Sequence, residues 1–239
     1  MTQLIIDGDI IAYKAAASSE TPINWGDGLW TLHAHEEDVE KYVDDFIFTL
    51  KKNAKCRKPY VVLSDKNNFR KDLAPFYKAN RKNTRKPMLL EYAKEYMREK
   101  FRATSKANLE ADDYMGILAL SFPDSVLWSE DKDLMTIPGK HLVNEDIIEV
   151  SLEEADRNFY TQVLTGDTTD NYKGCPGVGA VKAAKILADK YTPVEMWSAV
   201  LEAFEKAGLT EDEAILQARL AHIKREDRTD LWSPPQETK

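Results

Sequence analysis

The chain has 239 residues, enough for one large domain or for a core with a smaller satellite domain, and 43% of them are hydrophobic. No apolar run approaches the ~20 residues of a membrane-spanning helix, and the first residues lack the basic and apolar regions of a signal peptide. Two cysteines, Cys56 and Cys175, match no metal-ligand spacing, so we expect two reduced thiols in a cytoplasmic protein without a membrane partner.

Charge is distributed unevenly along the chain. The net charge of −8 at pH 7 argues at first against a nucleic-acid partner. Residues 51–86, however, hold thirteen Lys and Arg against two acids, a local balance of +11, which leaves −19 for the remainder. A protein that grips phosphates needs a local basic surface rather than a basic average. A solvated helix face would show the same composition, so the basic run alone leaves both interpretations open.

The predicted strands fall mostly in the first 150 residues. Residues 4–9, 60–65 and 126–134 each read as a buried strand that runs into acidic residues. Residues 22–32 carry a Gly-Asp-Gly turn between apolar and aromatic residues, which indicates a β-hairpin. Residues 141–150 would add a second hairpin at the edge of the sheet.

The predicted helices alternate with these strands and then dominate. Apolar spacing predicts a helix over 36–54. A second helix would start with Pro87 in its first turn and run to about Phe101, and a third over 108–120 would have Asn108 as its N-cap. From Ser151 onward the pattern is almost wholly helical, with an interruption at 166–179.

This order of elements predicts an α/β fold, an open and mostly parallel sheet flanked by helices, with a helical C-terminal part. We expect a catalytic core over 1–150, including a basic segment at about 66–102, and a helical region over 151–239. In such sheets the functional site gathers at the carboxyl ends of the strands. Acids follow all three candidate strands there: Asp7 and Asp9, Asp65, and Asp131 and Asp133.

Two further acidic groups join the strand-end acids. Glu110, Asp112 and Asp113 lie where a helix begins, and Asp167 and Asp170 are spaced so that one helical turn aims both the same way. Like charges gathered in this way cost free energy unless a cation is present. Each acid alone could be a helix cap or a solvated strand end, but five segments sharing the pattern indicate a metal site.

The ligand chemistry selects the kind of metal and reaction. Oxygen-only ligands favour Mg²⁺ or Mn²⁺, and none of the four histidines lies within an acidic motif. Two such ions suit phosphodiester hydrolysis. The chain has no serine elbow motif, no Walker A sequence and no glycine-rich dinucleotide fingerprint.

The motifs LIIDGD, VVLSD, FYKANRK, LEADD, SEDKDL and GDTTDNYKGCPGVG resemble, in order and spacing, the 5′-nuclease superfamily. That PIN-like family includes flap endonucleases, the 5′-nuclease domain of bacterial DNA polymerase I and bacteriophage exonucleases. The resemblance covers about residues 3–190 and is greatest to the exonucleases of T7-like bacteriophages. Residues 166–187 look like the family's helix–three-turn–helix.

The resemblance implies a role for each matching residue. Asp7, Asp65, Asp112 and Asp131 would form the first metal position, Glu110 and Asp113 would support it, and Asp133, Asp167 and Asp170 would hold the second. Asp9 falls where many relatives have Ser or Thr. Catalysis would depend on Asp112, Asp131, Lys78 and Arg81, the last two acting on the scissile phosphate from one face of a helix. The DNA-binding residues would be Phe69, Arg70, Tyr77, Lys78, Arg81, Gly174, Gly177, Gly179 and Lys182.

The implied activity is Mg²⁺- or Mn²⁺-dependent cleavage of DNA from 5′ ends or at 5′ flaps by a monomer, in DNA replication or degradation. RNA–DNA hybrids as substrates and a K⁺ ion at the glycine-rich loop stay open. Phe76 or Tyr77 would stack a terminal base, or would anchor the core instead. Val181 replaces a common Lys, and the arch region between Arg81 and Glu110 is short, which favours a simple clamp.

Three rival classes of protein fit the sequence less well. A PIN-type ribonuclease usually lacks the YKANRK segment and the helix–three-turn–helix. A 3′→5′ exonuclease of the four-carboxylate kind needs an Asp-x-Glu start, which the opening Asp-Gly-Asp does not supply. An inactive DNA-binding protein would have lost ligands, whereas every motif acid is present.

Overall fold

The computed structural model describes residues 3–236, which form two compact units. Unit 1 comprises residues 3–67, 85–131 and 139–149, and unit 2 comprises residues 68–84, 132–138 and 150–236. The two units are not separated by one boundary at residue 150, because the basic segment 68–84 belongs to the same unit as the C-terminal helices. Within residues 3–236, no helix has both the length and the apolar character needed to cross a membrane.

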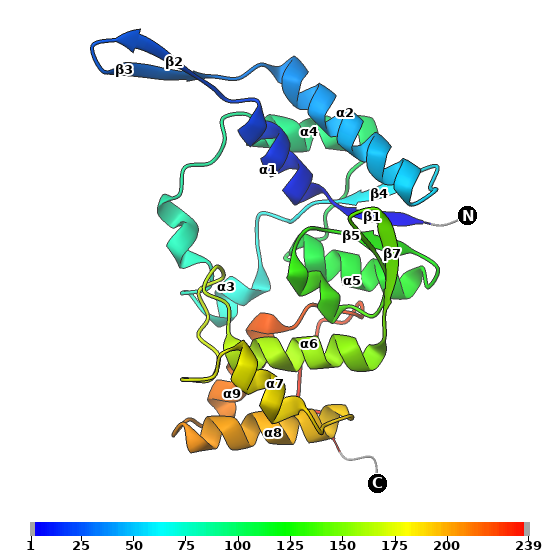
Figure 1. Ribbon diagram of the computed structural model, residues 1–239, viewed down its shortest axis with the longest axis vertical. Helices are drawn as coiled ribbons and strands as arrows, with labels where there is room; N and C mark the ends of the chain where they lie inside the picture. Colours follow the sequence, from blue (N-terminus) through cyan, green and yellow to red (C-terminus); the bar gives the residue numbers. More distant parts are fainter. Residues whose placement is uncertain (1–2, 237–239) are drawn as a thin grey trace. The chain divides into compact units, whose positions relative to one another are not determined.

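Unit 1 is built on a five-stranded sheet of order β4-β1-β5-β6-β7 (Figure 1). β1 (Leu4–Asp7) pairs in parallel with β4 (Pro59–Val62) and with β5 (Val126–Trp128), and β5 pairs in parallel with β6 (Gly139–Val143). β7 (Asp146–Val150) is the edge strand. Successive residues of β1 are fully buried, as expected of a parallel strand covered on both faces. The expectation of an α/β fold with a mostly parallel sheet is confirmed.

Helices cover both faces of this sheet (Figure 1). α1 (Gly8–Ser18), α2 (Glu36–Asn53) and α4 (Leu90–Phe101) pack together on one side, and α5 (Ala111–Ser121) packs against β1, β4 and β5 on the other. α2 buries its apolar residues at helical spacing, which is why the sequence predicted it correctly. The predicted hairpin is also present, as β2 (Thr21–Gly26) and β3 (Leu29–His33).

Unit 2 is helical. Its long helices are α6 (Leu152–Thr165), α7 (Ala180–Leu187), α8 (Pro193–Lys206) and α9 (Glu211–Ala221), and its short ones are α3 (Phe69–Leu73), η1 (Ala79–Asn83) and η2 (Lys132–Thr136). Capping boxes begin α6, α8 and α9, each pairing a Ser or Thr with a Glu three residues later. These caps satisfy backbone N–H groups and set where each helix begins.

Several predicted boundaries were wrong. The strands are shorter than expected: β1 ends at Asp7, so that Asp9 belongs to the first turn of α1. α4 begins at Leu90, which leaves Pro87 before the helix. Asn108 has a φ of 62° and does not cap α5; Glu110 is the N-cap because it forms a capping box with Asp113.

Candidate active site

Seven predicted acids of unit 1 lie either at or after the carboxyl ends of neighbouring parallel strands or at the N-terminus of α5, and we call them the acidic edge. β4, β1 and β5 are adjacent in the sheet, so the segments that follow them leave it side by side. The N-terminus of α5 joins these segments through hydrogen bonds described below. The members are Asp7, Asp9, Asp65, Glu110, Asp112, Asp113 and Asp131.

Asp7 is the most deeply buried strand-end acid, with 4% of its surface exposed. Its Oδ1 accepts hydrogen bonds from the backbone N–H groups of Asp9 and Ile10, at 3.0 and 3.3 Å, and thereby caps α1. Burial, together with the charge of Asp9, raises the pKa of the Asp7 carboxyl from 3.8 to about 7. The protein thus holds, at the end of an interior strand of its sheet, a carboxylate that a nearby cation would stabilise.

Two serines link the segments of the acidic edge. The Ser129 hydroxyl donates to Asp7 Oδ2 at 2.8 Å, and Ser129 Oγ accepts from the Asp131 N–H at 3.0 Å. Ser64 Oγ accepts from the N–H of Ala111, the first residue of α5, at 3.0 Å. Sequence reasoning missed both serines, although each directly precedes or nearly precedes a motif acid.

Asp65 and α5 are held by backbone hydrogen bonds. The Asn108 N–H donates to Asp65 Oδ2 at 2.8 Å, and the Asp65 N–H donates to the Leu109 carbonyl at 3.0 Å. The hydrogen bond from Asn108 is the main reason that the pKa of Asp65 lies below its ordinary value. Asn108, predicted as a helix cap, therefore orients Asp65 instead.

The three acids of α5 differ in exposure. Asp113 is fully buried and pairs with Glu110 in the capping box, which uses both side chains to satisfy the helix N-terminus. Asp112 lies between them and is partly exposed. The supporting role that the resemblance implies for Glu110 and Asp113, and the ligand role that it implies for Asp112, stay predictions.

The remaining predicted acids belong to unit 2. Asp133 lies in η2, and Asp167 and Asp170 lie in the loop that follows α6. The charges of all three act on the buried hydroxyl of Tyr172, whose pKa is raised first by burial and then by these carboxylates. Asp167 Oδ1 accepts from the N–H groups of Thr169 and Asp170, at 2.6 and 3.2 Å, so a turn rather than a helix aims the two acids.

Asp170 contacts the basic side chains that the sequence analysis assigned to the scissile phosphate. Arg81 Nη2 lies 2.5 Å from its Oδ1, Lys78 Nζ lies 3.4 Å from its Oδ2, and the Tyr77 hydroxyl donates to Oδ2 at 2.8 Å. Lys78 has a φ of 54° and precedes η1, so the expectation that Lys78 and Arg81 share one helix face was wrong. Contacts with Asp170, and not a shared helix face, bring Lys78 and Arg81 together.

Aromatic and basic residues of segment 68–84 divide into buried and exposed sets. Arg70 is 3% exposed and donates to the backbone carbonyls of Leu220 and His222, while its guanidinium also lies over the Phe69 ring. These contacts hold Arg70 within unit 2, whereas Phe69 stays partly exposed, and DNA contact by either residue stays a prediction. Tyr77 is buried as well, whereas Phe76 is 42% exposed.

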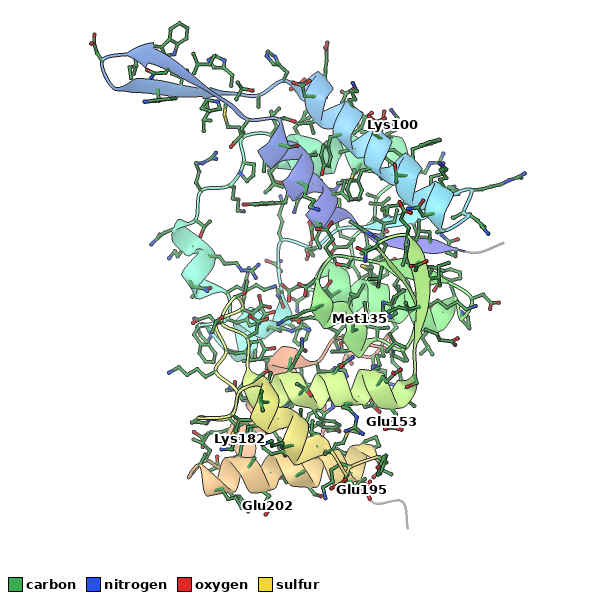
Figure 2. The ribbon with its side chains drawn as sticks, viewed as in Figure 1. Lys100, Met135, Glu153, Lys182, Glu195 and Glu202 are labelled. Carbon is green, nitrogen blue, oxygen red and sulfur yellow. The ribbon has the colours of Figure 1, made fainter. Side chains whose placement is uncertain are left out.

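The three glycines predicted to bind DNA differ in how much space surrounds them. A Cβ on Gly174 would lie 2.3 Å from the Gly166 nitrogen, and the Gly174 N–H already donates to Gln217 at 2.8 Å, so Gly174 closes the loop and is not available to phosphate. Gly177 and Gly179 face open space, and Gly179 is the N-cap of α7. Lys182, labelled on α7 in Figure 2, is exposed beside them.

The ten motif acids, the seven of the acidic edge and the three of unit 2, are thus distributed over both units. Within the described part of the chain, no three Asp, Glu, His or Cys side chains are gathered as ligands of a single ion. The donor set consists of oxygen atoms, as a hard cation requires.

Known proteins are similar to this chain in sequence. Residues 2–168 match the family model of the 5′-3′ exonuclease N-terminal, resolvase-like domain. The exodeoxyribonuclease of Enterobacteria phage T3 is 30% identical over 97% of this chain and 92% of its own length. The exonuclease of Escherichia phage T7 is also 30% identical, over 93% of this chain and 88% of its own length.

Solved structures share the fold. The T5 5′-exonuclease with divalent metal ions (zinc) bound superposes with a TM-score of 0.70 at 18% identity, covering 92% of this chain and 89% of that chain. The T5 flap endonuclease in complex with DNA and metal ions gives a TM-score of 0.64 at 16% identity, with the same coverage. With the family model matching most of the chain, and phage relatives matching nearly all of it, this protein belongs to the 5′-3′ exonuclease family.

Proposed function

We propose that this chain hydrolyses DNA phosphodiesters from 5′ ends and at 5′ flaps with Mg²⁺ or Mn²⁺, as a monomer acting in the cytoplasm. The observation that carries the proposal is the buried carboxylate of Asp7 within the acidic edge. Its pKa of about 7 reflects a cost of burying negative charge that a divalent cation would offset. Phage relatives named as exonucleases support the choice of reaction.

The residues present fit a hard cation. In unit 1, Asp7, Asp65, Asp112 and Asp131 offer carboxylate oxygens on adjacent segments, and in unit 2 Asp133, Asp167 and Asp170 do the same around Tyr172. Two bound cations would supply a water of lowered pKa and stabilise the leaving oxygen. The chain's own contribution is to hold these oxygens in place through Ser129, Ser64 and the N-terminus of α5.

Substrate handling follows from unit 2. Lys78 and Arg81 are held beside Asp170, where both can neutralise charge on a phosphate. Phe76 is exposed and able to stack a base. Gly177 and Gly179 leave room for a duplex phosphate at the N-terminus of α7, with Lys182 nearby, and the same loop is where we propose to look for K⁺.

A labelled duplex tests the proposal. One substrate carries a 5′ label and another a 3′ label, each incubated with Mg²⁺, with Mn²⁺ and with EDTA. We expect short 5′-phosphorylated products released from the 5′ end, and no cleavage in EDTA. Release of mononucleotides from 3′ ends, or cleavage that survives EDTA, would contradict the assignment. Repeating the assay with a 5′ flap and with an RNA–DNA hybrid determines the substrate preference.

The variant Asp131→Asn separates catalysis from DNA binding. It retains size and shape but removes one charge from an exposed position of the acidic edge. We expect cleavage to be lost while a duplex still binds, measured by fluorescence anisotropy in Ca²⁺. Full activity of this variant would show that the proposed metal positions are wrong.

A further inference from the structure

The two carboxylate oxygens of Asp9 contact different elements of unit 1. Its Oδ2 accepts from the backbone N–H of Ser64 at 2.8 Å. Its Oδ1 lies 2.7 Å from the ammonium group of Lys94, which projects from α4. One carboxylate in the first turn of α1 therefore ties α1 both to α4 and to the segment that follows β4.

The same connection continues beyond Asp9. The backbone N–H of Ser64 donates a hydrogen bond to Asp9, and the hydroxyl oxygen of Ser64 accepts one from the N–H of Ala111 at 3.0 Å. Asp65 directly follows Ser64, and Asp112 directly follows Ala111. Two hydrogen bonds thus join the three segments that carry Asp7, Asp65 and Asp112.

The ammonium of Lys94 determines which role suits Asp9. Both partners are largely shielded, with 18% of the Lys94 side chain and 25% of the Asp9 side chain exposed. A cation bound at Oδ1 would lie against this ammonium, and like charges repel strongly where solvent is scarce. Asp7 and Asp65, by contrast, have neutral hydrogen-bond partners: N–H groups and a hydroxyl.

We infer that Asp9 and Ser64 are positioning residues that hold the acid-bearing segments in register, with Lys94 compensating the charge of Asp9, and that Asp9 is not a metal ligand. The inference rests on the proposed function, since it assigns supporting residues to that same site. Asp9 and Ser64 set the spacing of the segments that carry Asp7, Asp65 and Asp112, and this role requires no contact with substrate.

The first experiment measures binding of Mn²⁺ alone, without DNA, by isothermal titration calorimetry. Asp7→Asn serves as the reference for a lost ligand. Glu130→Gln serves as the charge-matched control, because Glu130 also neighbours the edge and also pairs with a lysine, Lys14. We expect Asp9→Asn to stay within about threefold of Glu130→Gln, since Asn still accepts from Ser64. A loss as large as that of Asp7→Asn would make Asp9 a ligand and overturn the inference.

The second experiment measures kcat and KM on a 5′-labelled duplex. Loss of a residue that orients ligands typically costs about 10–100-fold, so we expect kcat to fall in that range for Asp9→Ala and Ser64→Ala, with KM nearly unchanged. Asp9→Asn and Ser64→Thr, which restore the acceptor, should recover most of it. Unchanged kcat in both alanine variants would also overturn the inference.

Two controls separate this inference from folding and from the proposed function. Ser19→Ala removes another buried hydroxyl of unit 1, one that donates to the Ala15 carbonyl away from the acids, and should leave kcat unchanged. Thermal unfolding in EDTA shows whether each variant folds. If the wild-type protein neither binds Mn²⁺ nor cleaves DNA, the proposed function fails by itself, independently of Asp9.

Discussion

Replacing Asp7 with Asn should stabilise the metal-free protein while abolishing cleavage. The Asp7 carboxyl is buried, and its pKa is raised from 3.8 to about 7 by that burial and by the charge of Asp9. Asn keeps an oxygen for the N–H groups of Asp9 and Ile10 but carries no charge. The substitution therefore removes an unfavourable charge and a proposed metal ligand in one step.

The pKa shift sets the sign and size of the effect. Between pH 4 and 7 the folded protein keeps a proton on Asp7 that the unfolded chain has lost, so this group lowers stability as pH rises through that window. A shift of about three pKa units corresponds to about 4 kcal/mol at pH 8, which is an upper bound for the gain in Asp7→Asn. For a chain of this size that bound equals a rise in Tm of roughly 8–16 °C.

Thermal unfolding in EDTA provides the assay. Wild type and Asp7→Asn are compared at pH 4 and pH 8, and Asp124→Asn serves as a control because Asp124 is nearly fully exposed in the same unit. We expect equal Tm values at pH 4, a higher Tm for Asp7→Asn at pH 8, and no effect of the control. Adding Mn²⁺ should raise the Tm of the wild type and not that of the variant.

The opposite order at pH 8 would refute the reasoning. If Asp7→Asn unfolds below the wild type in EDTA, then the hydrogen bonds to the charged carboxylate outweigh its desolvation, and Asp7 is a structural cap. A difference that is constant from pH 4 to pH 8 would show that titration of Asp7 does not contribute.

Three further predictions concern unit 2. Gly174→Ala should lower the free energy of unfolding in urea by about 3 kcal/mol or more, because its Cβ would lie 2.3 Å from the backbone of Gly166. Gly177→Ala should lower it by only about 1–2 kcal/mol, because only its φ of 72° is unfavourable. Tyr77→Phe should lose about 1.5–3 kcal/mol with its hydrogen bond to a carboxylate, measured in the same way. Lys78→Ala should lower kcat on duplex DNA about 100-fold or more with a nearly unchanged Tm.

Exposed residues supply the controls for these predictions. Tyr13→Phe removes a hydroxyl from a side chain that is 51% exposed and should leave stability unchanged. Lys82→Ala removes an exposed charge from the same basic segment as Lys78 and should retain kcat. If Lys78→Ala unfolds instead of slowing turnover, its contact with Asp170 is structural, and loss of kcat in both lysine variants would indicate a general charge effect.

Local patterns in the sequence were enough to predict most elements. Apolar spacing defines α2, the Gly-Asp-Gly turn defines the β2–β3 hairpin, and acids after buried strands indicate the acidic edge. These signals are local because a helix face or a tight turn is specified by neighbours in the chain. Element boundaries were less predictable. Asn108 is a preferred cap by residue type and Glu110 is not, and only the pairing of Glu110 with Asp113 shows where α5 begins.

The sequence by itself determined which residue types carry the chemistry: oxygen ligands for a hard cation, a basic segment for phosphate, and motifs that belong to the 5′-3′ exonuclease family. Tertiary structure decided how each member is used. It buries Arg70 and Tyr77 while exposing Phe76, and it pairs Asp9 with Lys94, 85 residues apart in the chain. Such partners meet only when the chain folds, because burial and long-range pairing have no periodic signal in the sequence.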